Sequence, residues 1–156
     1  MSALEGGSRI TPFLWFDNNA VDAAKFYCSI FPNSRLVTKL PDMREDGSAP
    51  PVLTVAFVLD GMPFTALNGG PKFKFTEAVS FVITCESQQE IDDYWSKLTA
   101  DGGSESMCGW LKDKFGLSWQ VVPARLGELL RHPTAIQALM KMKKLNIAEL
   151  ELAAAA

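Results

Sequence analysis

The chain has 156 residues, enough for one domain or two small modules that share a core, and 47% of them are hydrophobic. The formal net charge of -3 comes from 15 basic and 18 acidic residues without long runs, which argues against an electrostatic grip on nucleic acid or an anionic membrane. No stretch reaches the roughly 20 uninterrupted apolar residues of a membrane span. Residues 1–9, a predicted N-terminal tail, lack the features of a secretory signal. We therefore expect a cytoplasmic protein with no nucleic-acid or membrane partner.

Cysteine and histidine usage limits the chemistry further. Cys28, Cys85 and Cys108 are an odd number of cysteines at wide spacings, which indicates neither a disulfide framework nor a zinc knuckle. The single histidine, His132, excludes a two-histidine metal site within one chain. It precedes Pro133 near an expected helix end, where interaction with the last helical carbonyls is the simpler role.

The first predicted strand and helix occupy residues 10–16 and roughly residues 20–31. The strand is rich in aromatic and β-branched residues, and Pro12 near its start is typical of a sheet edge. The helix follows candidate caps at residues 17–19. Its apolar positions at helical spacing are Val21, Ala24, Cys28 and Phe31.

A half-exposed strand at residues 34–40 precedes a polar, Pro- and Gly-rich loop at residues 41–51. We expect this loop to be mobile, either as an ordinary surface connection or as a lid. Residues 52–59 and 62–68 then form a hairpin, because Asp60-Gly61 between two apolar runs suits a type I′ turn.

The second half repeats the order of strand and helix. Residues 78–85 read as a buried strand, residues 86–89 open a helix, and Gly102-Gly103 ends it. An offset of 68 residues aligns Phe16 with Thr84, Asn19 with Ser87, and Phe26-Tyr27 with Tyr94-Trp95. We therefore expect a duplicated βαβββ module, at residues 10–68 and 78–122, in one compact α+β domain. The two curved half-sheets would surround a cavity, with the helices outside.

Residues 108–120 predict a further hairpin, with a polar turn at residues 112–114 and a glycine at Gly116. On its second arm Leu117, Trp119 and Val121 share one face, and Ser118, Gln120 and Val122 share the other. Gln120 is thus a polar group on a largely apolar strand. It is either an edge-strand amide satisfied by backbone or water, or a group that faces a ligand.

Residues 123–156 change to a helical composition. Ala135, Leu139 and Met142 form one possible apolar stripe, which would pack on the core or on a second subunit.

Several blocks of sequence together resemble a known family. They are ITPFLWFDNNAVDAAKFYCSIFPNSR, FTALNGGPKFKFTEAVSFVI, CGWLKDKFGLSWQVVP and KMKKLNIAELELA. The chain is similar to the PhnB-like branch of the vicinal-oxygen-chelate (glyoxalase/bleomycin-resistance) superfamily, a branch that carries the name 3-demethylubiquinone-9 3-methyltransferase. The resemblance implies paired βαβββ modules, a cavity between curved sheets, and a homodimer.

The resemblance also locates the positions at which metal-dependent relatives place His or Glu ligands, on the first and last strand of each module. Their counterparts here fall at about Pro12, at residues 66–68, between Ala78 and Ser80, and at Gln120. None is a histidine or a carboxylate, and only Glu77 nearby could be recruited. Since one carboxylate does not hold a catalytic metal, we expect no metal and no cofactor.

The first functional hypothesis is therefore a protein that binds a small aromatic or apolar molecule bearing a polar group. Its predicted ligand contacts are Leu14, Phe64, Asn68, Ser80, Cys108, Trp110 and Gln120. Cys108 shares a predicted strand face with Trp110, either as an inert thiol or as a reactive one.

Two alternatives stay open. One is a superfamily enzyme, either a metal-dependent isomerase, lyase or dioxygenase, or the methyltransferase of the family name. Methyl transfer lacks support from the residues, because the chain has no glycine-rich turn between a strand and a helix for the cofactor. The other alternative is a structural dimer whose cavity is vestigial.

Overall fold

Each half of the chain folds as a strand, a helix and three further strands. The computed structural model describes residues 9–41 and 52–156, and the chain divides into two units, Met1–Lys74 and Phe75–Ala156. Apart from Pro41, the predicted mobile loop at residues 41–51 lies outside the described residues, as does nearly all of the predicted tail.

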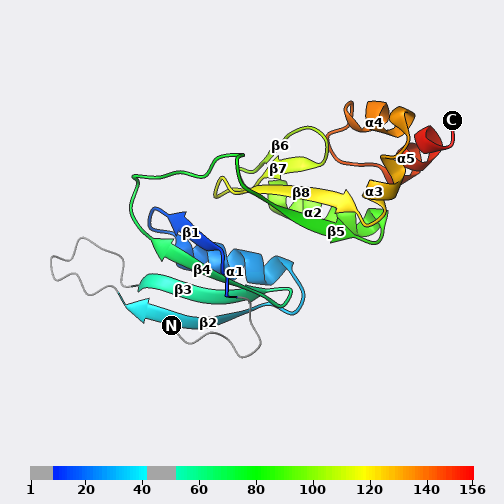
Figure 1. The fold of residues 1–156 in the computed structure, drawn as a ribbon. Helices are drawn as coiled ribbons and strands as arrows, with labels where there is room; N and C mark the ends of the chain where they lie inside the picture. The colour runs from blue at the N-terminus through cyan, green and yellow to red at the C-terminus, as the bar shows by residue number, and fades with distance from the viewer. Residues whose placement is uncertain (1–8, 42–51) are drawn as a thin grey trace. The chain divides into compact units, whose positions relative to one another are not determined.

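The first unit contains one four-stranded mixed sheet in the order β1-β4-β3-β2, with helix α1 against it (Figure 1). The strand β1 runs parallel to β4, and the other neighbours are antiparallel. The elements are β1 (Phe13–Phe16), α1 (Ala20–Ile30), β2 (Arg35–Pro41), β3 (Val52–Leu59) and β4 (Met62–Asn68).

The second unit repeats this arrangement in the order β5-β8-β7-β6, with β5 parallel to β8. Its elements are β5 (Ser80–Cys85), α2 (Gln88–Thr99), β6 (Ser104–Glu105), β7 (Trp110–Lys112), β8 (Ser118–Pro123), α3 (Leu126–Leu129), α4 (Pro133–Leu139) and α5 (Ile147–Ala154). The α+β class with two βαβββ modules and C-terminal helices is thereby confirmed, whereas the shared cavity stays a prediction. In the described part of the chain, no helix combines the length and apolar character that crossing a membrane requires.

The turn at Asp60-Gly61 has the predicted hairpin geometry. Asp60 has a φ of 45° and Gly61 a φ of 79°. Both values lie in the left-handed region that a type I′ turn requires at its two central residues. The right-handed twist of β3 and β4 is thus continued through the turn rather than broken by it.

The helix α1 packs on β3 and β4 through small side chains and one aromatic ring. Tyr27 is fully buried, and its ring stacks on Phe57 with the centroids 6.4 Å apart. The buried positions of the helix are Ala20, Ala23, Ala24, Tyr27 and Ile30. The predicted stripe is therefore wrong by about one residue, because Val21, Cys28 and Phe31 are only half-buried. Three alanines allow the helix to approach the sheet closely, which a simple apolar spacing does not reveal.

A side chain from β4 caps the N-terminus of α1. The N-cap residue Asn19 makes no side-chain cap hydrogen bond. Instead, the N–H of Ala20 donates to Oδ1 of Asn68 at 2.9 Å. The Nδ2 of Asn68 donates to the carbonyl oxygen of Val52 at 2.8 Å. One amide, 2% exposed, thus joins the helix start to two neighbouring strands.

The second helix caps itself, and it confirms part of the predicted repeat. The Oγ of Ser87 accepts a hydrogen bond from the N–H of Glu90 at 3.2 Å. Ser87 and Asn19 are the N-caps of α2 and α1, so the helices are offset by 68 residues as predicted. The strands are not, because β5 ends two residues before its cap and β1 ends three residues before. Phe16 therefore corresponds to Cys85, and its predicted match with Thr84 is wrong by one residue.

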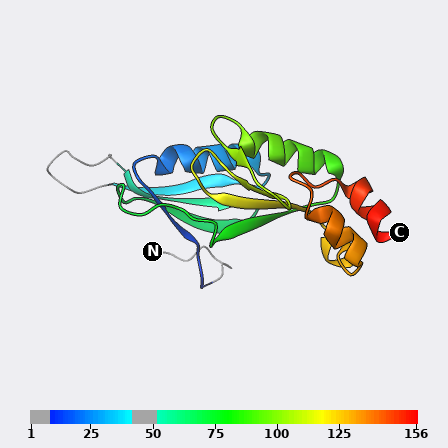
Figure 2. The same cartoon turned by 90° about the horizontal axis from the view of Figure 1, so that it is seen from above.

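The C-terminal helices form a small core of their own within the second unit. Figure 2 shows them beyond the end of β8. Val122, Leu129, Leu145 and Leu150 are buried together, and Leu139 and Met142 pack against them. Of the predicted stripe, Ala135 and Leu139 lie on α4, and Ala135 is fully buried, whereas Met142 lies beyond the end of this helix.

We predict that Asn68→Ala destabilises the chain by about 1 to 3 kcal/mol, because the N–H of Ala20 and the carbonyl of Val52 both lose a buried partner. The matched control is Asn19→Ala, which removes an amide without a cap hydrogen bond and should cost less than about 0.5 kcal/mol. Urea unfolding of the full chain measures both. Equal losses in the two variants would contradict the assignment of the cap to Asn68.

Candidate functional site

A buried carboxylate fixes the turn between β7 and β8. Asp113 is 2% exposed, and its Oδ1 accepts hydrogen bonds from the backbone N–H groups of Phe115 and Leu117 at 2.8 and 3.1 Å. Its Oδ2 accepts a hydrogen bond from Nε1 of Trp119 at 2.8 Å. Gly116 has a φ of 87°, which glycine adopts without strain. This turn, predicted from the sequence, sets the residue at which β8 begins.

The second sheet presents one face to α2, and most residues of the other face are partly or largely exposed, although Ser118 and Val122 on that face are buried. Strand residues alternate between the two faces, and α2 packs on β5, β7 and β8 (Figure 2). The residues on the α2 side are buried: Ile83, Cys85, Leu111, Trp119 and Val121. The opposite side, which we call the open face, carries Ser80, Val82, Thr84, Trp110, Lys112, Ser118 and Gln120. Val82, on the edge strand β5, is 56% exposed.

Three of the predicted ligand contacts lie together on this open face. The Nε2 of Gln120 donates to Oγ of Ser80 at 2.9 Å, and Trp110 is the strand partner of Gln120. Because β8 lies between β5 and β7, Gln120 is not an edge-strand amide, so that interpretation is wrong. Among the described contacts, the Oε1 of Gln120 and the hydroxyl proton of Ser80 have no partner, and both remain available to a ligand.

Cys108 lies outside β7, so the prediction that it shares a strand face with Trp110 is wrong. Its φ of 61° places it in a turn, followed by Gly109 at 83°. The N–H groups of Cys108 and Gly109 donate to the carbonyl oxygens of Met142 and Lys143 at 2.7 and 2.8 Å. The segment between α4 and α5 thus holds the turn that leads into Trp110, a link between distant parts of the sequence that no local pattern indicates.

The chain's thiols are unpaired, and burial sets the chemistry of two of them. Burial raises the pKa of Cys28. Burial, reinforced by the negative charges of Glu90 and Glu86, raises the pKa of Cys85 to about 12. At neutral pH these two side chains are therefore thiols rather than nucleophilic thiolates.

The other predicted contacts, Leu14, Phe64 and Asn68, lie on the α1 side of the first sheet. Leu14 is 6% exposed and Phe64 is 4% exposed, and the ring of Phe64 stacks on Phe57 at 5.4 Å. Both polar ends of Asn68 are engaged in holding α1. The structure therefore gives these three residues packing and capping roles within the first unit.

Strand pairing shows which residues of the two sheets correspond to each other. In the first sheet, Phe13 pairs with Thr65. In the second, Val82 takes the place of Phe13 and pairs with Gln120. Thr11 and Thr65 of the first unit therefore correspond to Ser80 and Gln120 of the second. They lie one residue from Pro12 and Ala66, where the resemblance placed the first two ligand positions of metal-dependent relatives. Hydroxyls and an amide are poor ligands for transition metals, and no group of three His, Cys, Asp or Glu residues gathers anywhere in residues 9–41 and 52–156.

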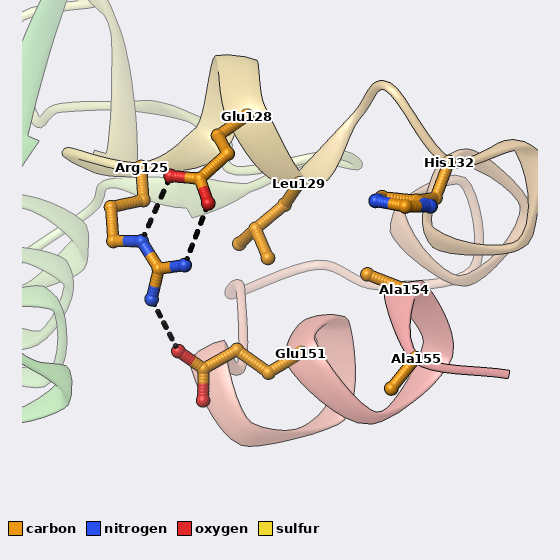
Figure 3. A pocket seen from close by; sticks show the side chains of 7 residues that line it. All are labelled: Arg125, Glu128, Leu129, His132, Glu151, Ala154 and Ala155. Atoms are coloured by element: carbon orange, nitrogen blue, oxygen red, sulfur yellow. Dashed lines mark hydrogen bonds and ion pairs between the residues drawn. The ribbon is translucent and has the colours of Figure 1, made fainter.

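A hollow of about 450 Å³ lies between α3 and α5 (Figure 3). Its lining residues are Arg125, Glu128, Leu129, His132, Glu151, Ala154 and Ala155. Arg125 is already engaged by two carboxylates, those of Glu128 at 2.9 Å and Glu151 at 3.3 Å. His132 lies apart from this cluster in Figure 3, and it makes no side-chain cap hydrogen bond to α4. The ion pair of Arg125 with Glu151 thus joins the start of α3 to α5. The charge of Arg125 is balanced by the two carboxylates that line the same hollow.

Comparison with known proteins gives one family match and several related structures. The chain matches the family described as 3-demethylubiquinone-9 3-methyltransferase over residues 8–122. It is 34% identical to a PhnB protein from Bacillus cereus, with a TM-score of 0.68, and the match covers 75% of this chain and 100% of that one. No curated protein matches the chain.

Two further structures share the fold at lower identity. A protein from Pseudomonas aeruginosa is 20% identical with a TM-score of 0.63, covering 75% of this chain and 98% of that one. The fosfomycin resistance protein of Listeria monocytogenes, in a complex with Mn(II) and sulfate, is 13% identical with a TM-score of 0.56, covering 80% and 95% of the two chains. The family match ends at Val122, so α3 to α5 lie outside it.

We predict that Asp113→Asn lowers the free energy of unfolding by about 1 to 3 kcal/mol, because an amide cannot accept all three hydrogen bonds that the carboxylate accepts. Asp101→Asn, at an exposed position with a φ of 54° that asparagine tolerates, is the matched control and should change stability little. Urea unfolding followed by circular dichroism compares the two variants. A wild-type midpoint for Asp113→Asn would show that the carboxylate does not organise the hairpin.

Proposed function

We propose, from the premise that this chain belongs to the 3-demethylubiquinone-9 3-methyltransferase family of PhnB-like proteins, that it binds a small organic molecule on the open face of its second unit. The membership itself confirms the resemblance inferred from the sequence. The observation that carries the proposal is the pair formed by Gln120 and Ser80, at 2.9 Å, beside the indole of Trp110. Convergent neutral polar groups next to an aromatic side chain are typical of sites for organic ligands.

The chemistry of the pair supports recognition of a polar group on an apolar body. An amide oxygen accepts hydrogen bonds and a hydroxyl donates them, so the two together fix a carbonyl, carboxyl or hydroxyl group. The exposed side chain of Val82 and the ring of Trp110 supply apolar contact on either side of Gln120. Ser80, Trp110 and Gln120 thus keep their predicted roles in the proposal.

The proposal contains no metal-dependent step. The resemblance implies ligand positions at or beside Thr11, Thr65, Ser80 and Gln120, and neutral hydroxyl and amide oxygens do not fit zinc, iron or manganese in a catalytic site. The single nearby carboxylate, Glu77, is engaged in an ion pair with Lys112. The residues present therefore do not fit the metal that the superfamily implies.

The methyl transfer in the family name meets a similar difficulty. A nucleotide-type cofactor site needs a glycine-rich turn between a strand and a helix, where the backbone can approach the cofactor closely. The two such turns here read Asp17-Asn18-Asn19 after β1 and Glu86-Ser87 after β5. Neither contains glycine, so these turns do not fit that cofactor.

We predict that Gln120→Leu weakens ligand binding by about 1 to 3 kcal/mol, the cost of leaving a buried polar partner unsatisfied, while the chain stays folded. Thr84→Val, on the same open face and without a hydrogen bond to Gln120 or Ser80, is the control and should bind as wild type. Native mass spectrometry of protein purified without added metal identifies the ligand that co-purifies, and calorimetry gives the affinities.

The enzyme alternative predicts a different outcome of the same measurements. Stoichiometric metal held by Glu77 or Gln120 and required for turnover would contradict the binding proposal in favour of that alternative. Ligand binding that is unchanged in Gln120→Leu would also contradict the proposal that the ligand binds at Gln120.

We further propose that the protein forms a homodimer. The edge strands β1 and β5 each carry an exposed large apolar side chain, Phe13 at 53% and Val82 at 56%. Exposed apolar side chains at sheet edges favour association with a second copy. Sedimentation equilibrium tests this, and a monomer at every concentration would contradict it.

A further inference from the structure

We propose that the ligand of the open face carries a carboxylate, and that Lys112, Ser118 and Ser80 bind it after it displaces the carboxylate of Glu77. This inference rests on the proposed function, since it names the chemical class of the molecule bound there. None of the residues Glu77, Lys112 and Ser118 is a ligand contact that the sequence predicts by itself.

Three strands place the polar residues of the site in one row. Lys112 of β7 is the strand partner of Ser118 of β8, and Ser118 is the strand partner of Ser80 of β5. Neighbouring side chains on one face of a sheet lie about 5 Å apart at Cβ. An ammonium and two hydroxyls therefore line up across the first residue of β8. The next row along the same face contains Trp110, Gln120 and Val82.

An ion pair crosses this row. Glu77 lies just before β5, and its carboxylate pairs with Nζ of Lys112 on β7. Because β8 runs between β5 and β7, the pair spans the end of the sheet at which Ser118 begins β8. The chain itself thus already supplies a carboxylate to the lysine of the row. Both side chains are partly exposed, at 39% for Lys112 and 62% for Glu77, so solvent screens the pair and a competing anion can replace it.

Ser118 is the second, independent sign of a ligand at this position. Its side chain is 1% exposed, and its Oγ has no hydrogen-bond partner among the described residues. A buried hydroxyl without a partner is unfavourable, and native proteins seldom retain one without a reason. A ligand oxygen placed between Lys112 and Ser80 would accept the hydrogen bond that Ser118 cannot donate within the chain.

The chemistry of the row selects an anion. Lysine offers only donors, and the hydroxyls of Ser118 and Ser80 each have a proton to donate. The three groups match the several acceptor sites of a carboxylate, and a charged acceptor forms the stronger hydrogen bonds. The adjacent row then takes the body of the ligand, with Trp110 suited to an aromatic ring. The ligand class that fits both rows is an aromatic carboxylate.

Benzoate and benzamide provide a matched pair of probes, because they have nearly the same shape and differ in charge. Calorimetry with the full chain should show that the wild type prefers benzoate. Glu77→Gln, which removes the internal competitor, should raise the affinity for benzoate about three- to tenfold and leave that for benzamide unchanged. Lys112→Met should abolish the preference. Thr84→Val, on the same face, should bind both probes as wild type does.

Ser118→Ala separates binding from folding. We expect it to weaken benzoate binding about tenfold, equivalent to about 1.4 kcal/mol. The thermal midpoint should stay unchanged or rise, because the variant loses a hydroxyl that has no internal partner. A lowered midpoint with unchanged benzoate affinity would overturn the proposal, since it would show that the hydroxyl is satisfied within the chain.

The outcomes also separate this inference from the proposed function. If the wild type binds both probes equally, and Gln120→Leu weakens both, the open face is a binding site but the carboxylate inference is wrong. If the wild type binds neither probe, or binds them independently of Gln120, both proposals are wrong. A preference for benzoate over benzamide that persists in Lys112→Met would show that Lys112 does not bind the carboxylate, and would overturn the proposal.

Discussion

The position of the open face depends on the carboxylate of Asp113. Three donors converge on this buried side chain, two from the backbone of the turn and one from the indole of Trp119. Side chains alternate along a strand, so a shift of one residue at the turn would exchange the two faces of β8. Gln120 and Ser118 would then lie against α2, and Trp119 would be exposed. One buried charge therefore decides which residues the sheet offers to a ligand.

The two units use polar side chains differently at corresponding places. In the first unit, the amide of Asn68 ends β4 and caps α1, so both of its polar ends serve the fold. In the second unit, α2 caps itself through Ser87, and no strand side chain is needed for this purpose. The polar groups of the second sheet are thereby left for other roles. This difference explains why our proposals concern the second unit although the modules share one topology.

This chain keeps the fold of its family, but its residues at the implied ligand positions do not indicate metal chemistry. The match over residues 8–122 identifies the family, and the fold agrees with it. At the positions where the resemblance implies metal ligands, this chain nevertheless carries threonine, serine and glutamine. A fold can retain its strands while the side chains that carry chemistry are replaced, because packing on the helix face does not depend on the opposite face. The name of a family is therefore a weaker guide to this protein than the donors and acceptors on its strands.

The sequence by itself determined the order of the elements, the repeat of the helices, the hairpins and the alternation of Ser118 and Gln120. These features are local, since they arise from side-chain period, turn residues and caps that lie within a few positions of one another. It did not determine the roles of Leu14, Phe64 and Asn68, because only the position of α1 decides which face of the first sheet is covered. The sequence also could not pair Lys112 with Glu77, or join the turn at Cys108 to the segment at Met142. Those contacts link residues far apart in the chain, and only the register of the strands and the packing of the helices bring them together.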